Sequence, residues 1–315
     1  MKNPRIVFMG TPEFAVHILQ HLIEKKYQIV GVVTAPDRPA GRGQKIQESA
    51  VKKYAKLKNL RILQPTNLKA EAFVRELKQL TPDIGVVVAF RMLPKSVWDL
   101  PTLGTFNLHA SLLPNYRGAA PINWALINGE AQTGVTTFFL DENIDTGAII
   151  TQNQVEITQK DNAGTLHDKL MEQGALLVDQ TLQMITTQKI QPKKQESTQI
   201  LKSAPKLDSS NTKIDWRQSP ETIYNFVRGL YPYPIAWTHL KNGTQVLRCK
   251  IFKVETEEAV HQLENGKITI ANGRFKVAVP KGFILVQEMQ LPGKKRMPVE
   301  QLLNGLRLNE NAYMY

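Results

Sequence analysis

The sequence contains a single cysteine, Cys249, among 315 residues. One cysteine cannot form an internal disulfide or a cysteine metal cluster, so neither can hold this fold together. No apolar run approaches the ~20 residues that a membrane-spanning helix needs. The apolar stretch at 6–9 is too short for a signal peptide and is soon followed by Glu13. We therefore expect a soluble, cytoplasmic protein that does not contact a membrane.

Two phosphate-binding motifs are missing as well. The strand expected over 5–9 turns at Met9-Gly10-Thr11-Pro12, without the glycine spacing of a dinucleotide site, and the chain has no P-loop. His17 and His21 lie four apart on the predicted helix that follows, but the glutamate of an H-E-x-x-H motif is absent. We expect neither a nucleotide cofactor nor a bound metal.

Acidic residues are scarce relative to basic ones. The chain has 28 Asp and Glu against 40 Lys and Arg, a net charge of +12. Residues 190–315 hold 19 basic and 11 acidic side chains, whereas residues 1–189 hold 21 and 17. The later part is therefore the more basic, as expected for a part that binds a polyanion.

Strand and helix patterns alternate through the first half of the chain. Short apolar strands are expected over 5–9, 29–34 and 84–89, with helices between them over 12–25, 49–58 and 71–80. Thr11 is the expected N-cap of the first helix, with Pro12 at its first position. This alternation predicts an α/β fold with a Rossmann-like, doubly wound and mostly parallel sheet.

The second half has a different character. After a long amphipathic helix expected over 163–185, the chain becomes rich in Lys, Gln, Ser and Thr. Short strands then follow, separated by Asn-Gly turns that are typical of hairpins. A length of 315 residues also favours two domains. We predict a catalytic domain over 1–189, a linker over 190–205 and a small OB-like β-barrel over 206–315.

The segment Phe106–Gly118 is the strongest candidate for a site. On a strand, Asn107 and His109 point to the same side, which places an amide donor beside an imidazole. Such a pair is often only ordinary hydrogen bonding. The Leu113-Pro114 turn with Tyr116-Arg117-Gly118, and a second polar loop at 141–147, favour a functional site. Ligands of open α/β sheets bind at such strand ends.

Two other segments can contribute to this site. Phe90-Arg91-Met92 follows the central strand, and these side chains either line a pocket for a flat ring or only pack. Residues 35–48 form a long predicted loop that is either a surface loop or a basic finger. In the second case Arg38, Arg42 and Lys45 contact phosphates.

Several motifs together resemble the folate-dependent formyltransferases. They are the N-x-H strand, the loop Ser111-Leu-Leu-Pro-x-Tyr-Arg-Gly118 and Asp145-Thr-Gly147. The segments 8–14, 36–43 and 228–234 are similar to the members of this family that act on methionyl-tRNA. The resemblance covers both halves of the chain. It implies transfer of a formyl group from 10-formyltetrahydrofolate to the amino group of initiator methionyl-tRNA, for translation initiation. It also implies a Rossmann-like catalytic domain and an OB-like barrel.

The resemblance also implies roles for single residues. Asn107, His109 and Asp145 match the catalytic residues of the family, and Arg42 lies in its tRNA-inserting loop. The folate loop matches Ser111, Leu112, Leu113 and Pro114, and Arg91 stands where the family usually has glycine. Lys206 and Arg228 are among the basic residues expected to contact tRNA phosphates.

The chemistry needs side chains of these types. An amine that attacks a formyl carbon creates an oxyanion, for which Asn107 and His109 can donate hydrogen bonds. Asp145, if hydrogen-bonded to His109, would set its tautomer and help to remove the proton of the amine. Two alternatives stay open: formyl transfer to a small amine, and a nucleic-acid-binding protein without activity. Nothing in the sequence requires more than a monomer.

Overall fold

The computed structural model describes residues 3–40, 44–196 and 201–315. The chain forms two compact units. The first contains the described residues of Met1–Gly118, Thr133–Glu156 and His167–Ser203, and the second those of Ala119–Gln132, Ile157–Leu166 and Ala204–Tyr315. The predicted domains were continuous stretches, whereas each unit is assembled from discontinuous segments. The short strands β8 (Arg117–Gly118) and β11 (Ser203–Ala204) lie where the chain passes from one unit to the other.

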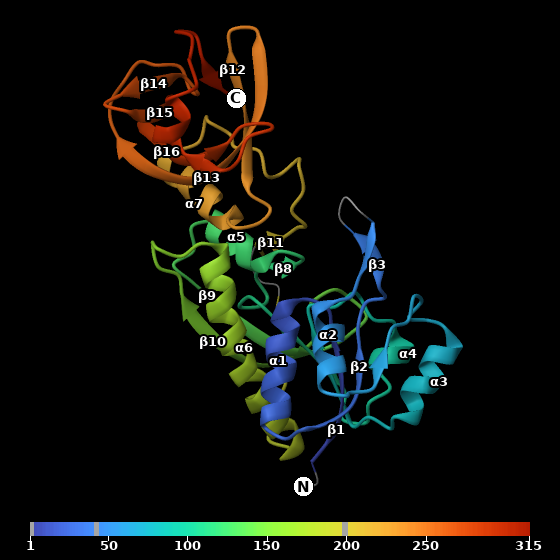
Figure 1. The fold of residues 1–315 in the computed structure, drawn as a ribbon. Helices are drawn as coiled ribbons and strands as arrows, with labels where there is room; N and C mark the ends of the chain where they lie inside the picture. Colours follow the sequence, from blue (N-terminus) through green and yellow to red (C-terminus); the bar gives the residue numbers. More distant parts are fainter. Residues whose placement is uncertain (1–2, 41–43, 197–200) are drawn as a thin grey trace. The chain divides into compact units, whose positions relative to one another are not determined.

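A seven-stranded sheet forms the centre of the first unit (Figure 1). Its order is β10-β9-β7-β6-β1-β2-β5. The strands are β1 (Arg5–Gly10), β2 (Gln28–Val33), β5 (Ile62–Leu63), β6 (Ile84–Val88), β7 (Thr105–His109), β9 (Gln132–Phe139) and β10 (Ile149–Glu156). The five strands from β5 to β7 are parallel, and β9 runs antiparallel to β7. The predicted Rossmann-like, mostly parallel sheet is confirmed.

The strand order reverses at β1. The chain adds β2 and β5 on one side of β1, then crosses to add β6 and β7 on the other side. A doubly wound sheet opens a crevice at the carboxyl ends of the strands beside such a reversal. The ends of β6 and β7 therefore lie where this fold positions a ligand.

Helices cover both faces of this sheet. On one face, Phe73 and Leu77 of α3 (Glu71–Gln79) and Val97 of α4 (Lys95–Trp98) pack against Val7 and Val87 of the sheet. The other face is covered by α1 (Glu13–Glu24) and the long α6 (Ala163–Thr186), which Figure 1 shows in blue and yellow-green. There the Thr181 hydroxyl of α6 is 2.7 Å from the Thr137 hydroxyl of β9.

Two local predictions differ from the structure. Pro12, not Thr11, is the N-cap of α1, because its extended backbone directly precedes the first helical residue, Glu13. Residues 35–48 were expected to form a loop, but β3 (Arg38–Ala40) and β4 (Lys45–Gln47) pair there as an antiparallel ribbon. Its base is held by Asp37, which accepts from Lys52 Nζ at 2.5 Å and from Gln64 Nε2 at 2.9 Å. The next helix, α2 (Ala50–Leu57), begins after its N-cap Ser49.

The second unit is built on an antiparallel sheet of order β14-β15-β16-β13-β12-β18, with β17 paired to β16. The strands are β12 (Ala236–Asn242), β13 (Gln245–Glu258), β14 (Ile268–Ala271), β15 (Arg274–Val279), β16 (Gly282–Gln290), β17 (Met297–Pro298) and β18 (Tyr313–Met314). Met314 N–H donates to the Gly266 carbonyl at 2.8 Å, and Ile268 N–H donates to the Ala312 carbonyl at 3.3 Å. The two edges therefore meet, and the sheet forms the predicted, nearly closed barrel.

Three helices belong to this unit: α5 (Pro121–Ile127), α7 (Pro220–Leu230) and α8 (Val299–Leu303). Asn123 Nδ2 of α5 donates to the Gly229 carbonyl of α7 at 2.8 Å. Arg228 Nη1 of α7 donates to the carbonyls of Thr158 and Asp161 at 2.8 and 3.1 Å. These contacts attach segments 119–132 and 157–166 to the second unit, although both precede the predicted linker in the sequence.

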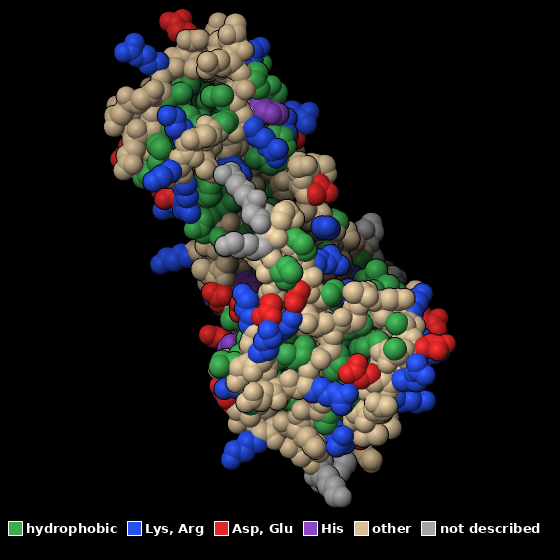
Figure 2. Space-filling model, turned by 45° about the vertical axis from the view of Figure 1, so that its right-hand side comes forward, with side chains coloured by type: hydrophobic (Ala, Val, Ile, Leu, Met, Phe, Trp, Pro, Cys, Tyr) green, Lys and Arg blue, Asp and Glu red, His purple; other side chains and the backbone are tan. Residues whose placement is uncertain are grey.

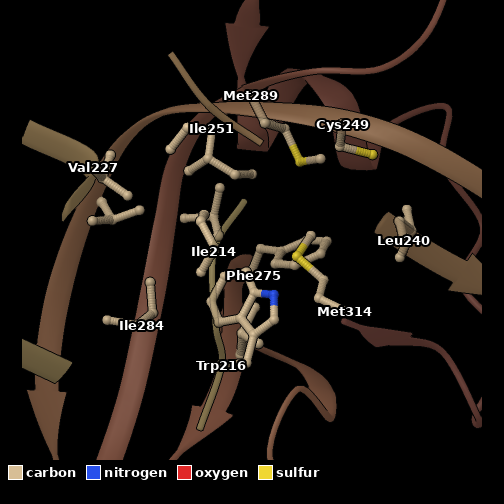
Figure 3. Packing of buried hydrophobic residues seen from close by; sticks show 14 of the residues in the cluster. Ile214, Trp216, Val227, Leu240, Cys249, Ile251, Phe275, Ile284, Met289 and Met314 are labelled. Carbon is tan, nitrogen blue, oxygen red and sulfur yellow. The ribbon is translucent and has the colours of Figure 1, made fainter. Parts of the chain in front are cut away.

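The barrel interior is apolar (Figure 3). Trp216, Phe275 and Met314 pack together there, and Trp216 Nε1 donates to Thr238 Oγ1 at 2.8 Å.

Both units carry lysine and arginine side chains on their surfaces (Figure 2). No helix of the described residues combines the length and apolar character that a membrane span requires.

Cys249 should report on unfolding of the barrel. Its side chain is fully buried, and burial raises the pKa of the thiol to about 11. At pH 8 about one such thiol in a thousand is ionised, against about a quarter for an ordinary cysteine. We expect the native protein to resist iodoacetamide and to be alkylated readily in urea, as measured by mass spectrometry. Rapid alkylation without denaturant would contradict this packing.

Candidate active site

The candidate site lies at the carboxyl ends of β6 and β7. Thr105 of β7 points toward α4, because its hydroxyl donates to the Trp98 carbonyl at 2.6 Å. Side chains alternate along a strand, so Asn107 and His109 point to this same face. The structure thus places both residues on one strand, β7; their joint role in a site stays a prediction. Asp145 arrives from the loop between β9 and β10.

His109 is held in a defined orientation. Its ring is 7 % exposed, and Nε2 lies 2.8 Å from the Tyr116 carbonyl oxygen. A carbonyl only accepts hydrogen bonds, so Nε2 must carry a hydrogen. Nδ1 lies 3.8 Å from Asp145 Oδ2, too far for a hydrogen bond. The Tyr116 carbonyl therefore sets the tautomer, a task that the sequence prediction gave to Asp145. Nδ1 of the neutral ring is left to accept a proton.

Asp145 is held by the backbone around it. Its Oδ2 accepts from Gly118 N–H at 3.0 Å, and its side chain is 16 % exposed. Its backbone is left-handed, with φ +55°, and Tyr116 has φ +60°. Strained residues of this kind cluster at functional sites. Two left-handed, non-glycine residues thus lie on either side of the His109 imidazole.

The Asp145 loop has its own internal support. Asp141 accepts from Asn143 N–H at 3.0 Å and from the Thr146 hydroxyl at 2.8 Å. Gly147 passes so close to β9 that a Cβ there would lie 1.7 Å from the Phe139 carbonyl oxygen. Only glycine fits this position, which explains the last residue of the Asp-Thr-Gly motif in physical terms.

Gln195 completes this support, and sequence reasoning missed it. Its side chain is 9 % exposed, although it lies in the predicted linker. Nε2 donates to the Asp145 and Gly147 carbonyls at 3.0 and 2.8 Å. Oε1 accepts from Arg117 Nε and Nη2 at 3.1 and 2.7 Å. One amide therefore joins the Asp145 loop to the segment that contains Tyr116 and Gly118.

Replacing Gln195 by leucine should loosen both loops. The change leaves two carbonyls and the Arg117 guanidinium without their partner, and a shift of about 1 Å at reacting groups can cost about a hundredfold in rate. We expect kcat to fall about tenfold to a hundredfold. Gln191→Leu, an exposed substitution in the same segment, is the matched control. Equal rates for the two variants would remove Gln195 from the site.

Asn107 offers an available donor. Its side chain is partly exposed. Within the described residues, no protein group hydrogen-bonds its amide, unlike the imidazole of His109. An amide in this position can donate to a carbonyl oxygen of a bound molecule.

The loop after β7 is fixed by hydrogen bonds. The Ser111 side chain is fully buried, and its hydroxyl donates to the Asn115 carbonyl at 2.7 Å. Gln152 Nε2 donates to the Leu113 carbonyl at 2.9 Å, and the Leu113 side chain is buried. Leu112 and Pro114 are half-buried. Of the four predicted folate residues, these two therefore have side-chain surface to offer, whereas Ser111 shapes the loop.

Comparison with known proteins identifies the family of the chain. A family model described as "Formyl transferase" matches residues 4–182, and one described as "Formyl transferase, C-terminal domain" matches residues 206–307. The chain belongs to the formyl transferase family. The motifs at 106–118 and 145–147 lie within the first match. The second match lies within the more basic part of the chain, residues 190–315.

Relatives match the whole chain. The methionyl-tRNA formyltransferase of Flavobacterium johnsoniae is 54 % identical, with 100 % of each protein covered. That of Bacteroides thetaiotaomicron is 50 % identical, with 98 % of each covered. A crystal structure of HypX from Aquifex aeolicus with tetrahydrofolic acid has a similar fold, with TM-score 0.65 and 16 % identity. The match covers 98 % of this chain, which spans about half of HypX, 49 %.

Arg91, in the segment after β6, is held by backbone carbonyls. Its guanidinium donates to the Thr66 carbonyl at 3.0 Å and to the Pro65 carbonyl. Burial lowers the pKa of Arg91, and the nearby Arg38 charge lowers it further. Phe90 packs partly against the sheet core, and Met92 is 63 % exposed. Arg91 thus fixes its own loop to residues 65–66, and Met92 offers apolar surface.

The predicted tRNA residues lie in several places. Arg38 is exposed on β3, Lys45 belongs to β4, and Arg42 lies outside the described residues. Lys206 is exposed in the second unit. Arg228 is bonded to backbone carbonyls and lines a cavity of about 360 Å³ within that unit. Arg228 therefore supports the second unit in addition to its predicted role. The tRNA contacts of all five residues stay predictions.

Proposed function

We propose that this chain is a methionyl-tRNA formyltransferase. It transfers the formyl group of 10-formyltetrahydrofolate to the free amino group of methionine on initiator tRNA, giving N-formylmethionyl-tRNA for translation initiation. The observation that carries the proposal is the distance of 3.8 Å between His109 Nδ1 and Asp145 Oδ2, with Asn107 two residues before His109 on the same strand. The full-length likeness to enzymes of that name supports the choice of substrate.

Asn107 acts on the carbonyl oxygen. When the amine attacks the formyl carbon, negative charge develops on this oxygen, and the Asn107 amide donates a hydrogen bond to it. A preorganised donor of this kind is worth about 10²–10³ in rate. The amide has no protein hydrogen-bond partner among the described residues, so no protein hydrogen bond has to break for this.

His109 and Asp145 carry out the proton transfer. The attacking amine must lose a proton and the leaving nitrogen must gain one. His109 Nδ1 is the ring atom able to hold it, because Nε2 stays bonded to the Tyr116 carbonyl. The Asp145 carboxylate, 3.8 Å away, stabilises the imidazolium while it exists. Ser111 takes no part as a nucleophile, since its hydroxyl is bonded to the Asn115 carbonyl.

The formyl donor fits the loops around these groups. Phe90 and Met92 follow β6, and Leu112 and Pro114 follow the neighbouring β7. Their partly exposed apolar surfaces suit a flat ring, whereas a sheet edge lined with charges would not. We infer that these residues hold the pterin part of the folate next to Asn107.

The tRNA accounts for the basic part of the chain. Residues 190–315 carry 19 basic against 11 acidic side chains, and they include an OB-like barrel. Nothing in the sequence requires more than one copy of the chain, and we infer a monomer. Translation initiation places it in the cytoplasm.

A formylation assay tests this function. The protein is incubated with 10-formyltetrahydrofolate and with methionyl-tRNA, glycinamide ribonucleotide or an amino sugar, and the products are separated by chromatography. We expect formyl groups on methionyl-tRNA alone. Formylation of a small amine instead would move the chain to another reaction of the family, and tRNA binding without formylation would make it an inactive binding protein.

A further inference from the structure

The barrel carries a row of aromatic side chains on its outer surface. On β12, Ala236, Thr238 and Leu240 are buried, whereas the alternating side chains point outward. His239 exchanges backbone hydrogen bonds with Tyr315 at 3.0 and 3.1 Å, which brings the end of the chain beside β12. We call the outward group the aromatic platform; it consists of Trp237, His239, Tyr313 and Tyr315 with Lys213, Lys241 and Arg248.

The rings of the aromatic platform touch one another in sequence. The centroids of Trp237 and His239 are 5.1 Å apart, those of His239 and Tyr315 5.2 Å, and those of Tyr315 and Tyr313 5.6 Å. Trp237 Nε1 also donates to the Ser209 carbonyl at 3.2 Å. Tyr315 is 41 % exposed. The rings are therefore held in place by their neighbours while one edge of the row faces solvent.

Cations lie over these rings. The Arg248 guanidinium is 4.0 Å from the Trp237 centroid, and Lys241 Nζ is 5.5 Å from the Tyr313 centroid. Lys213 Nζ lies between Trp237 and Tyr315, at 5.7 and 5.1 Å. Such contacts orient a charge without neutralising it.

In the described part of the chain, these cations are not paired with carboxylates. Arg217, Lys276 and Arg296 of the same unit each form an ion pair. Across the described residues, Lys213, Lys241 and Arg248 form none. Burial lowers the pKa of His239, and the charges of Lys213 and Arg248 lower it further. The platform is thus a positively charged surface whose charge is available to an anionic ligand.

We propose that the aromatic platform binds unpaired nucleotides of the tRNA substrate. Bases stack on the rings of Trp237 and Tyr315, and Lys213, Lys241 and Arg248 contact the adjoining phosphates. Aromatic rings interleaved with unpaired cations are the combination by which barrels bind single-stranded nucleic acid. A surface that binds a protein partner is expected to be more apolar and to carry fewer charges than the aromatic platform. This inference rests on the proposed function, which supplies the tRNA.

Binding measurements on two kinds of variant test the platform. Tyr315→Leu and Trp237→Leu remove stacking but keep the charge, whereas Lys213→Gln with Arg248→Gln removes charge but keeps the rings. We expect each aromatic variant to bind tRNA about tenfold more weakly with an unchanged salt dependence. The double charge variant loses two phosphate contacts. The slope of log K against log salt concentration should therefore become shallower by about two. KM for methionyl-tRNA should rise, with kcat unchanged at saturation.

A matched control is available in the same barrel. Lys276 lies 5.5 Å from the Phe283 centroid, but Glu257 neutralises it at 2.6 Å. Phe283→Leu should therefore leave tRNA binding unchanged. Tyr315 is 41 % exposed, so its variant keeps the test valid if Trp237→Leu unfolds. Equal weakening by Phe283→Leu and Tyr315→Leu would overturn the proposal.

Short RNAs separate this inference from the proposed function. The aromatic variants should bind a single-stranded oligoribonucleotide more weakly than the wild type does. Their affinity for a duplex of equal length should be unchanged. If the wild type formylates methionyl-tRNA but the variants bind both RNAs normally, the platform proposal fails and the function stands. If the wild type formylates nothing yet the variants lose single-strand binding, the function fails and the platform stands.

Discussion

Replacing His109 by alanine should lower formyl transfer by about 10²–10⁴-fold, the usual contribution of a positioned acid or base. The variant loses Nδ1, the proposed proton carrier, and also the Nε2 hydrogen bond to the Tyr116 carbonyl. The loss should lie in kcat, because the ring acts on the proton and not on substrate binding. Single-turnover rates with saturating methionyl-tRNA and folate measure it.

His109→Gln separates the two functions of the ring. A glutamine amide can still donate to the Tyr116 carbonyl but cannot carry a proton. We expect it to be as inactive as the alanine variant, while its thermal unfolding stays close to that of the wild type. If glutamine restored most of the rate, His109 would serve only to hold the Tyr116 segment, and proton transfer would belong to another group.

Local patterns predicted the strand that carries the site. The two-residue spacing of Asn107 and His109 placed both side chains on one face, because side chains alternate along any strand. The Asn-Gly turn at 242–243 marked the hairpin between β12 and β13, where Gly243 has φ +61°. In each case the signal lies within a few neighbouring residues.

Features set by distant contacts could not be predicted in this way. The His109 tautomer depends on the Tyr116 carbonyl, a backbone atom that any residue type would supply. Gln195 lies in a stretch of polar residues whose composition is that of a linker, and its role depends on two carbonyls of the Asp145 loop, 48 and 50 residues away. Segments 119–132 and 157–166 join the second unit through contacts with α7.

The paired strands at 38–40 and 45–47 are a second feature that local composition did not predict. Its proline, glycine and basic residues favour a loop, and the sequence prediction followed them. The paired strands depend on an anchor outside the segment, where Lys52 and Gln64 bind Asp37. Local composition thus identified the segment as unusual, but tertiary contacts set its conformation.

Asp145→Asn should lower kcat by about a hundredfold to a thousandfold, within the range of general acid–base effects. Asparagine has the same shape and can still accept from Gly118 N–H, and Gln195 holds the backbone at residue 145. The loop should therefore keep its conformation. What is lost is the negative charge 3.8 Å from Nδ1 that stabilises the imidazolium. The tautomer should not change, since the Tyr116 carbonyl sets it.

Asp141→Asn is the matched control for this prediction. It removes the same charge from the same loop, and one side-chain oxygen remains to accept from Asn143 and Thr146. We expect less than about a fivefold loss, because the Asp141 carboxylate binds its own loop, whereas the Asp145 carboxylate faces the imidazole. Parallel kcat measurements decide the point. Equal losses in the two variants would mean that the loop responds to its overall charge, and a wild-type rate for Asp145→Asn would exclude this carboxylate from proton transfer.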